Sequence, residues 1–201
     1  MDGYALVIAW YLEMTEPTQL RPARPPRVDA RFRQATPDPA WSRRFYEQIG
    51  SDWSWTDRRC WSAHQWEAWV AGPGYEMWVA EVADEPVGYL ELDGGPRGDV
   101  EVAYFGILPG FTGVGLGGSL LTAGVRGAWR RGADRVWLHT CSLDAPHALA
   151  NYEARGFRPY DFVVRRSRRP SAGAGEPGRV EGTATQPPDR PTSGSPAPGT
   201  G

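Results

Sequence analysis

Apolar positions follow two different spacings along the chain, and the spacing separates expected strands from expected helices. Short apolar runs rich in β-branched and aromatic residues predict strands at residues 4–14, 76–82, 87–93, 100–107, 135–140 and 157–164. Residues 28–34 alternate apolar and charged positions and form a further strand candidate. Apolar residues spaced by three and four predict helices over 115–131 and 146–155.

Two earlier helices are recognised by their ends. Asp38 and Pro39 begin the first, and Gly50 ends it. Ser62 is the expected N-cap of the second, which Gly72 ends. An antiparallel meander followed by strand, helix and strand predicts a mixed α/β sheet with one parallel crossover. Either 4–14 or 28–34 is the first strand of that sheet, since both segments fit.

A glycine-dense turn follows the strand at 100–107. Pro109 ends the strand, and Gly113, Gly115, Gly117 and Gly118 then lead into a helix. Glycine adopts positive φ and lets a ligand approach the main chain. A helix N-terminus exposes N–H groups without internal partners, and together with the helix dipole they favour an anion such as a phosphate.

Two common phosphate loops fit this turn poorly. A Walker loop requires a Lys after its last glycine, and none follows Gly115. The dinucleotide fingerprint G-x-G-x-x-G occurs as Gly113, Gly115 and Gly118, but its acidic partner about 20 residues later is missing. The strand at 136–140 is followed by Cys141 instead. A nucleotide-binding oxidoreductase is therefore kept only as a third hypothesis.

Two motifs carry a resemblance to a known family. Residues 108–117 read LPGFTGVGLG, and residues 148–157 read ALANYEARGF. In order and spacing they resemble L-P-x-x-R-G-x-G-x-G and A-x-x-x-Y-E-x-x-G-F, two signatures of the GNAT superfamily of acyl-CoA-dependent N-acyltransferases. Thr112 stands where Arg or Gln is usual. The resemblance implies a GNAT fold over residues 31–166, a central mixed β-sheet with splayed strands flanked by helices.

The resemblance also implies how acetyl-CoA is held. Main-chain groups near the end of the central strand would contact the pantetheine arm and polarise the thioester carbonyl, and the glycine turn would hold the pyrophosphate. The implied acetyl-CoA-binding residues are Ile107, Leu108, Thr112, Gly113, Val114, Gly115, Leu116, Gly117 and Asn151.

Two residues are implied to carry the chemistry. Tyr152 matches the general acid that protonates the departing CoA sulfur, although it also fits a ring that fills the seam between helix and sheet. A phenol pKa of about 10 is near that of a thiol, about 8.5. Glu101 stands where some members place a general base, and it equally fits a strand-end carboxylate. Glu91 is the reserve base. The implied reaction is direct acetyl transfer to a primary amine in a ternary complex.

The segment between the first two helices is crowded with aromatic residues. Trp53, Trp55 and Trp61 are candidates for the lining of an acceptor pocket, where Asp52 or Asp57 would attract a cationic amine. Packing of the helices onto the sheet explains these tryptophans equally well. The expected acceptor is a small-molecule or peptide amine.

The remaining reactive side chains suggest little. Cys141 near His139 or His147 could indicate a thiol nucleophile, but a small residue at a strand end is the simpler interpretation. Three histidines and two cysteines show no metal spacing, so no metal is expected. The alternative function is a non-catalytic acyl-CoA-binding or regulatory domain. It is suggested by Thr112, which replaces the usual Arg or Gln of the loop.

Composition sets the wider limits. With 201 residues and 40% apolar content, the chain can form one domain with a substantial core. A net charge of -2 gives no bulk attraction to nucleic acid or to an anionic membrane, and no apolar run is long enough to span one. Two cysteines and no basic leader predict a cytoplasmic setting. Homodimers are common in the superfamily, so a homodimer is also considered.

Two flanking segments complete the predicted organisation. Residues 1–30 are expected to form an N-terminal strand and a Pro-rich connector outside the domain at 31–166. Residues 167–201 are rich in Pro and Gly and are expected to be disordered, because they cannot bury enough apolar surface to offset the entropy of ordering.

Overall fold

The computed structural model describes residues 4–168, apart from residues 54, 96 and 97. The strands are β1 (Tyr4–Met14), β2 (Arg31–Ala35), β3 (Glu76–Val82), β4 (Glu85–Gly94), β5 (Asp99–Ile107), β6 (Arg135–Cys141) and β7 (Arg158–Arg168). The helices are α1 (Pro39–Gly50), α2 (Ala63–Val70), α3 (Leu116–Arg130) and α4 (Ala148–Ala154), with short 3-10 turns η1 (Pro17–Gln19) and η3 (Pro109–Phe111). The strands and helices expected from the sequence are all present, and only their ends differ.

All seven strands form one sheet in the order β2-β3-β4-β5-β6-β1-β7. Strands β2 to β5 are an antiparallel meander, and β5 and β6 are parallel neighbours joined through α3. The predicted mixed α/β sheet is therefore confirmed. Strand β2 lies at the edge, whereas β1 lies between β6 and β7 and is antiparallel to both. The N-terminal strand is thus an interior part of the same sheet, not an addition outside residues 31–166.

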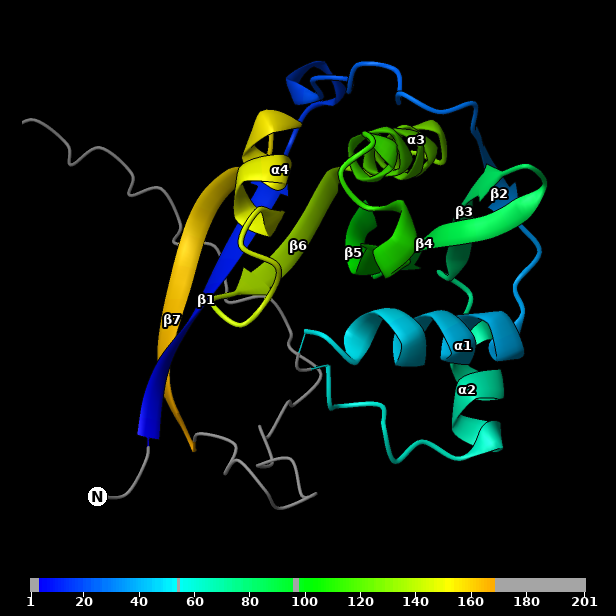
Figure 1. The fold of residues 1–201 in the computed structure, drawn as a ribbon. Coiled ribbons are helices and arrows are strands. Elements are labelled where there is room, and N and C mark those ends of the chain that lie inside the picture. Colours follow the sequence, from blue (N-terminus) through cyan, green and yellow to red (C-terminus); the bar gives the residue numbers. More distant parts are fainter. Residues whose placement is uncertain (1–3, 54, 96–97, 169–201) are drawn as a thin grey trace, which may run out of the picture.

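Helices cover both faces of the sheet (Figure 1). Helices α3 and α4 lie on one face, and α1 and α2 lie on the other. Gly127 of α3 lies so close to the sheet that a Cβ there would be 2.4 Å from the Trp78 ring. On the opposite face, a Cβ on Gly106 of β5 would be 2.5 Å from Ile49 of α1. These contacts fix the glycine turn at the start of α3 on one face and the α1–α2 layer on the other.

The local signals that begin α1 and α2 act as the sequence predicts. The Asp38 carboxylate accepts hydrogen bonds from the backbone N–H groups of Ala40 at 2.8 Å and Trp41 at 3.2 Å. Ser62 and Gln65 form a reciprocal capping box at the start of α2. The Ser62 box therefore fixes where the segment between the two helices ends and α2 begins.

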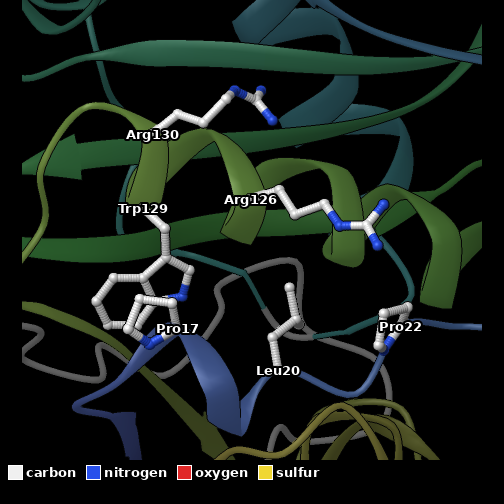
Figure 2. Close-up of a pocket in the computed structure, with 6 residues that line it drawn as sticks. All are labelled: Pro17, Leu20, Pro22, Arg126, Trp129 and Arg130. Atoms are coloured by element: carbon white, nitrogen blue, oxygen red, sulfur yellow. The ribbon is translucent and has the colours of Figure 1, made fainter.

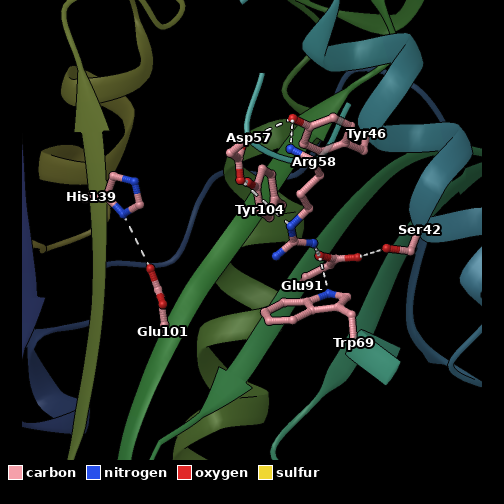
Figure 3. A network of polar contacts seen from close by, with 9 residues as sticks. All are labelled: Ser42, Tyr46, Asp57, Arg58, Trp69, Glu91, Glu101, Tyr104 and His139. Atoms are coloured by element: carbon pink, nitrogen blue, oxygen red, sulfur yellow. Dashed lines mark hydrogen bonds and ion pairs between the residues drawn. The ribbon is translucent and has the colours of Figure 1, made fainter. Parts of the chain in front are cut away.

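A β-bulge in β5 determines which side chains reach which face. The register between β4 and β5 shifts at Ala103, which has no partner on β4. A bulge of this kind moves the following side chains to the opposite face. Glu101, before the bulge, and Tyr104, after it, therefore share the face covered by α1 and α2 (Figure 3). Phe105 packs against the core on the α3 side.

The connector, residues 15–30, crosses the outer side of α3 between β1 and β2 (Figure 1). A hollow of about 330 Å³ lies between its first part and the C-terminal half of α3 (Figure 2), lined by Pro17, Leu20, Pro22, Arg126, Trp129 and Arg130. At a rise of about 1.5 Å per residue, this hollow begins about 15 Å along α3 from the glycine turn. It is therefore separate from the site described below.

The C-terminal boundary differs slightly from the expectation. Ser167 and Arg168 are the last residues of β7, not the first of a tail. The rest of the expected disordered tail, residues 169–201, lies outside the described residues. Among the helices of the described part, none combines the length and the apolar character needed to cross a membrane.

Candidate active site

The centre of the candidate site is the place where β5 and β6 separate. These parallel strands pair only from Asp99 with Arg135 to Glu101 with Trp137. Beyond Glu101, β5 continues to pair with β4, and β6 continues to pair with β1. The facing edges of β5 and β6 therefore carry main-chain groups without a strand partner. We call this region the strand gap, and it confirms the splayed strands predicted for the sheet.

Main-chain hydrogen bonds show which residues face the strand gap. Ile107 pairs with Gly88 of β4, and the Leu108 N–H donates to the Val87 carbonyl at 2.8 Å. In an antiparallel pair with this pattern, the N–H and C=O of Ile107 point away from β4, toward the gap. Phe105, two residues earlier, has the same orientation. The Leu108 amide is already bonded to Val87, so of the two residues expected to contact the pantetheine arm it is Ile107 that directs its N–H toward the gap. Phe105 is a further residue with this orientation, and the sequence argument did not name it.

The glycine turn has the geometry of an anion cradle. Gly113 and Gly115 adopt φ of +80° and +96°, values that favour glycine. Gly115 is the N-cap of α3, and Leu116 and Gly117 form its first turn. Backbone N–H groups at these positions have no intrahelical acceptor. Within the described part of the chain, the N–H groups of residues 113–115 have no backbone acceptor either. Phosphate oxygens would satisfy these donors.

Thr112 contributes less than its place in the turn suggests. Its hydroxyl donates to the Pro109 carbonyl at 3.1 Å, and its N–H approaches the same oxygen at 3.5 Å. Both donors are thus turned back onto the preceding 3-10 turn. The position also carries no positive charge, so the cradle lacks a cation of its own at the place where Arg or Gln is usual.

Tyr152 lies on the α3 and α4 face of the sheet, next to the strand gap. Its ring is 9% exposed and packs against Phe105 at 6.1 Å and Phe157 at 6.2 Å between ring centroids. Burial, followed by the charge of Asp144, raises the Tyr152 pKa well above its ordinary value. The group is therefore a proton donor at neutral pH, although a weaker acid than an exposed phenol.

Asn151, the neighbour of Tyr152, lies where α4 meets the first turn of α3. Its Oδ1 atom is 3.6 Å from the point where a Cβ on Gly118 would lie. Arg155 reaches the same point from the end of α4, with Nη1 at 2.7 Å. Both side chains thus stand beside the anion cradle, in a place that suits the cofactor-binding role expected for Asn151.

Glu101 and His139 meet on the opposite face, where the strands begin to part. Glu101 Oε1 lies 3.4 Å from His139 Nδ1, and the two side chains are 21% and 42% exposed (Figure 3). Burial lowers the His139 pKa, but the hydrogen bond to Glu101 and the charges of Glu101, Asp144 and Asp57 outweigh it and raise the pKa above its ordinary value. His139 is therefore a partner of the predicted base Glu101, a role that the sequence analysis did not assign to this histidine.

Glu91, the reserve base, is a buried carboxylate with a structural role. It is 0% exposed, and its carboxylate accepts hydrogen bonds from Arg58 Nη1 and Trp69 Nε1, each at 3.0 Å (Figure 3). The Tyr75 hydroxyl donates to the same carboxylate, also at 3.0 Å. The Ser42 hydroxyl donates a further bond. A carboxylate with this many donors and no exposure cannot reach an acceptor amine, so Glu101 is the better placed of the two.

Arg58 organises the aromatic residues between α1 and α2. Its guanidinium lies over the rings of Trp69 at 3.9 Å, Tyr104 at 4.0 Å and Trp61 at 4.5 Å. This side chain is 5% exposed and is paired with Glu91. Burial lowers the Arg58 pKa, but the charge of Glu91 together with the smaller effects of Tyr104, Tyr89 and Asp57 outweighs burial and raises the pKa. Trp61 therefore stacks on a buried cation instead of lining an open pocket.

The other two candidate tryptophans also serve packing. Trp55 lies against Tyr46 and Tyr104, with ring centroids at 5.6 Å and 5.0 Å. Trp53 contributes to the cluster around Phe45. These contacts favour the packing interpretation of all three tryptophans over the pocket interpretation.

Asp57 is the acidic residue of this segment that reaches the site. Its side chain is 43% exposed, and its carboxylate accepts bonds from the Tyr46 hydroxyl at 3.0 Å and from the Tyr104 hydroxyl (Figure 3). Its charge also contributes to the raised His139 pKa, as described above. Asp52 is exposed and accepts a bond from Ser51 at 3.4 Å. Asp57 is therefore the better candidate to attract a cationic amine.

Cys141 lacks the character of a nucleophile. Burial, followed by the charge of Asp144, raises its pKa to about 11, so the thiol stays protonated at neutral pH. Within the described residues, no group of three or more His, Cys, Asp or Glu side chains is arranged to hold a metal ion.

Comparisons with known proteins agree with this geometry. Residues 40–157, more than half of the chain, match the family model for the acetyltransferase (GNAT) family. No curated protein matches the chain. A GCN5-related N-acetyltransferase from Kribbella flavida shares the fold at a TM-score of 0.56 and 19% identity, over 83% of this chain and 60% of that one.

Two further structures share the fold. A GCN5-related N-acetyltransferase from Sphaerobacter thermophilus has a TM-score of 0.58 and 19% identity, over 84% of this chain and 54% of that one. The ribosomal-protein-S18-alanine N-acetyltransferase from Escherichia coli has a TM-score of 0.51 and 17% identity, over 65% of this chain and 78% of that one. The chain thus spans 60% or less of the Kribbella and Sphaerobacter proteins. The family match, with which the geometry agrees, shows that the chain belongs to the GNAT family of acetyltransferases.

Proposed function

We propose that this protein is an N-acetyltransferase that moves an acetyl group from acetyl-CoA to a primary amine by direct attack. The observation that carries the proposal is the arrangement around the strand gap. The anion cradle and Tyr152 lie on one face of the sheet, and Glu101 with His139 lies on the other. A thioester held in the gap would therefore have an acid on one side and a base on the other.

The residues present fit acetyl-CoA. The N–H donors of residues 113–117 suit its pyrophosphate. The unpaired main-chain groups of Phe105 and Ile107 suit its amide-containing pantetheine arm, which can add to the edge of β5 like a short strand. Acetyl-CoA, when bound, supplies an acetyl group activated as a thioester. The N–H of Ile107 is the group that we assign to polarise the carbonyl, because the Leu108 N–H is already bonded to Val87.

The chain's own residues would handle both protons of the transfer. As the amine nitrogen forms a bond to the acetyl carbon and the bond from carbon to sulfur breaks, the amine must lose a proton and the thiolate must gain one. Glu101 and His139 are placed to accept the first, and the Tyr152 hydroxyl is placed to donate the second. The raised Tyr152 pKa is compatible with this role, because an apolar site disfavours the thiolate as well as the phenolate.

The acceptor would approach from the α1 and α2 side. Asp57 and Glu101 carry negative charge there, which favours a cationic amine or a basic peptide. Among similar structures, one is an aminoglycoside acetyltransferase from an uncultured soil sample, and another acetylates a ribosomal-protein alanine. Both acceptors are amines, in agreement with this class. The two unpaired cysteines, Cys60 and Cys141, suit a reducing cytoplasm.

The test compares wild type with Tyr152→Phe in the release of CoA thiol from acetyl-CoA across a panel of cationic amines. Removal of a general acid typically lowers the rate by about 10²–10⁴-fold. We expect kcat to fall by about that factor, while CoA binding and the melting temperature persist because phenylalanine keeps the ring that packs against Phe105 and Phe157. An unchanged kcat would exclude Tyr152 as the acid. CoA binding without turnover on any amine would favour a non-catalytic acyl-CoA-binding domain.

A further inference from the structure

The connector runs along α3 directly to the anion cradle. Four contacts follow one another in order: Ala23 N–H donates to Thr122 Oγ1 at 3.0 Å, Ser119 Oγ donates to the Arg24 carbonyl at 3.4 Å, Pro26 Cα lies 3.1 Å from the Cβ position of Gly115, and Arg27 N–H donates to the Val114 carbonyl at 2.8 Å. Each step moves toward the N-terminus of α3. The connector therefore delivers Arg27 to the residue just before the helix N-cap.

A second cation comes from the end of α4. Arg155 Nη1 lies 2.7 Å from the Cβ position of Gly118, over the first turn of α3. Its Nε atom is buried and has no hydrogen-bond partner in the described part of the chain. The Arg155 carbonyl accepts a bond from the Arg21 N–H at 2.9 Å, which ties α4 to the connector. The two arginines thus flank the cradle from different elements.

Neither guanidinium is neutralised by a carboxylate. None of the ion pairs among the described residues involves Arg27 or Arg155. Arg27 is exposed, so its long side chain can swing to a ligand at little cost in desolvation. Cations without a partner beside free N–H donors favour an anion, and guanidinium groups match phosphate oxygens in a paired geometry.

We propose that Arg27 and Arg155 clamp the pyrophosphate of the acyl-CoA donor and supply the positive charge that Thr112 does not. This inference rests on the proposed function and adds to it. The binding site would then include the connector, a segment outside the signature loop. Threonine at position 112 would then still allow acyl-CoA binding, because Arg27 and Arg155 supply the positive charge from other parts of the sequence.

The test measures binding, independently of turnover. Isothermal titration calorimetry with CoA would compare wild type, Arg27→Gln, Arg155→Gln and the matched control Arg126→Gln. Arg126 is an exposed arginine of α3, the helix whose N-terminus forms the cradle, and it lies beside the hollow, away from the cradle. We expect Arg27→Gln and Arg155→Gln each to weaken CoA binding about tenfold, or about 1.4 kcal/mol, with no change in the control. Melting temperatures without ligand confirm that each variant is folded.

Two further arms sharpen the test. Dephospho-CoA lacks the 3′-phosphate but keeps the pyrophosphate, so the same tenfold losses are expected with it. Thr112→Arg in the Arg27→Gln background should restore most of the affinity. Arginine variants that bind CoA as tightly as the control would overturn the clamp, and so would losses that disappear with dephospho-CoA. If the wild type binds CoA and the arginine variants bind it equally well, only the clamp is refuted. If the wild type does not bind CoA, both the clamp and the proposed function are refuted.

Discussion

Replacement of Glu91 by Gln should destabilise the protein strongly. Glu91 is 0% exposed and is paired with Arg58, itself 5% exposed, at 3.0 Å. Glutamine keeps the shape but removes the charge, which leaves a buried guanidinium without compensation. Its amide NH2 would also face the hydroxyl and indole donors that now bond the carboxylate. Breaking a buried ion pair in this way typically costs about 3–5 kcal/mol.

In a domain of this size, about 1 kcal/mol shifts the melting temperature by about 2–4 °C. We therefore expect a fall of about 6–20 °C, measured by circular dichroism and checked by urea unfolding. Ser42→Ala, which removes one donor and keeps the ion pair, should cost only about 1 kcal/mol. A joint replacement of Glu91 by Leu and Arg58 by Met should cost less than Glu91→Gln, because both charges leave together. A Glu91→Gln loss below about 1 kcal/mol, with a changed pH dependence of kcat, would refute the structural role and return Glu91 to candidacy as the base.

Three further predictions concern the site and its support. The His139 pKa, followed by NMR, should lie above its ordinary value and fall in Glu101→Gln, because the Glu101 contact raises it. The stability that this pair adds is complete below about pH 6.5 and is lost as pH rises through the raised His139 pKa. Glu101→Gln should therefore destabilise the protein more at pH 6 than at pH 9. Equal effects at both pH values would exclude the pairing. Asp57→Asn should raise KM for a cationic amine several-fold more than for a neutral one, as measured by initial rates, and equal KM values would remove Asp57 from the acceptor site. Gly156→Ala should lower the melting temperature by several degrees, since φ is +102° and a Cβ would lie 1.9 Å from the Gln19 carbonyl oxygen; an unchanged value would contradict this strain.

The elements and the glycine turn could be predicted because their signals are local. Asp38 and Ser62 cap helices through bonds to residues two or three positions away, and Gly113 and Gly115 adopt the positive φ that a tight turn requires. The splayed strands followed from the resemblance in the loop and in the later motif around Tyr152. Such features depend on a few neighbouring residues, so a single sequence contains them.

The features that could not be predicted depend on contacts between distant segments. The bulge at Ala103 places Glu101 and Tyr104 on one face, and only the register of β4 reveals it. The bonded Leu108 amide likewise depends on β4. His139 gains its importance from a residue on another strand. The place of β1 between β6 and β7 also lies beyond local patterns, because it is determined by competition among all strands for pairing partners.

The central claim is that the glycine turn and the strand gap bind acetyl-CoA. The most direct measurement is calorimetric titration of the full chain with acetyl-CoA and, separately, with NAD. A ligand that binds the cradle should also raise the melting temperature in proportion to its affinity and concentration. The account predicts saturable binding of acetyl-CoA near one equivalent and no binding of NAD. Absence of acetyl-CoA binding, or preferential binding of NAD, would contradict it.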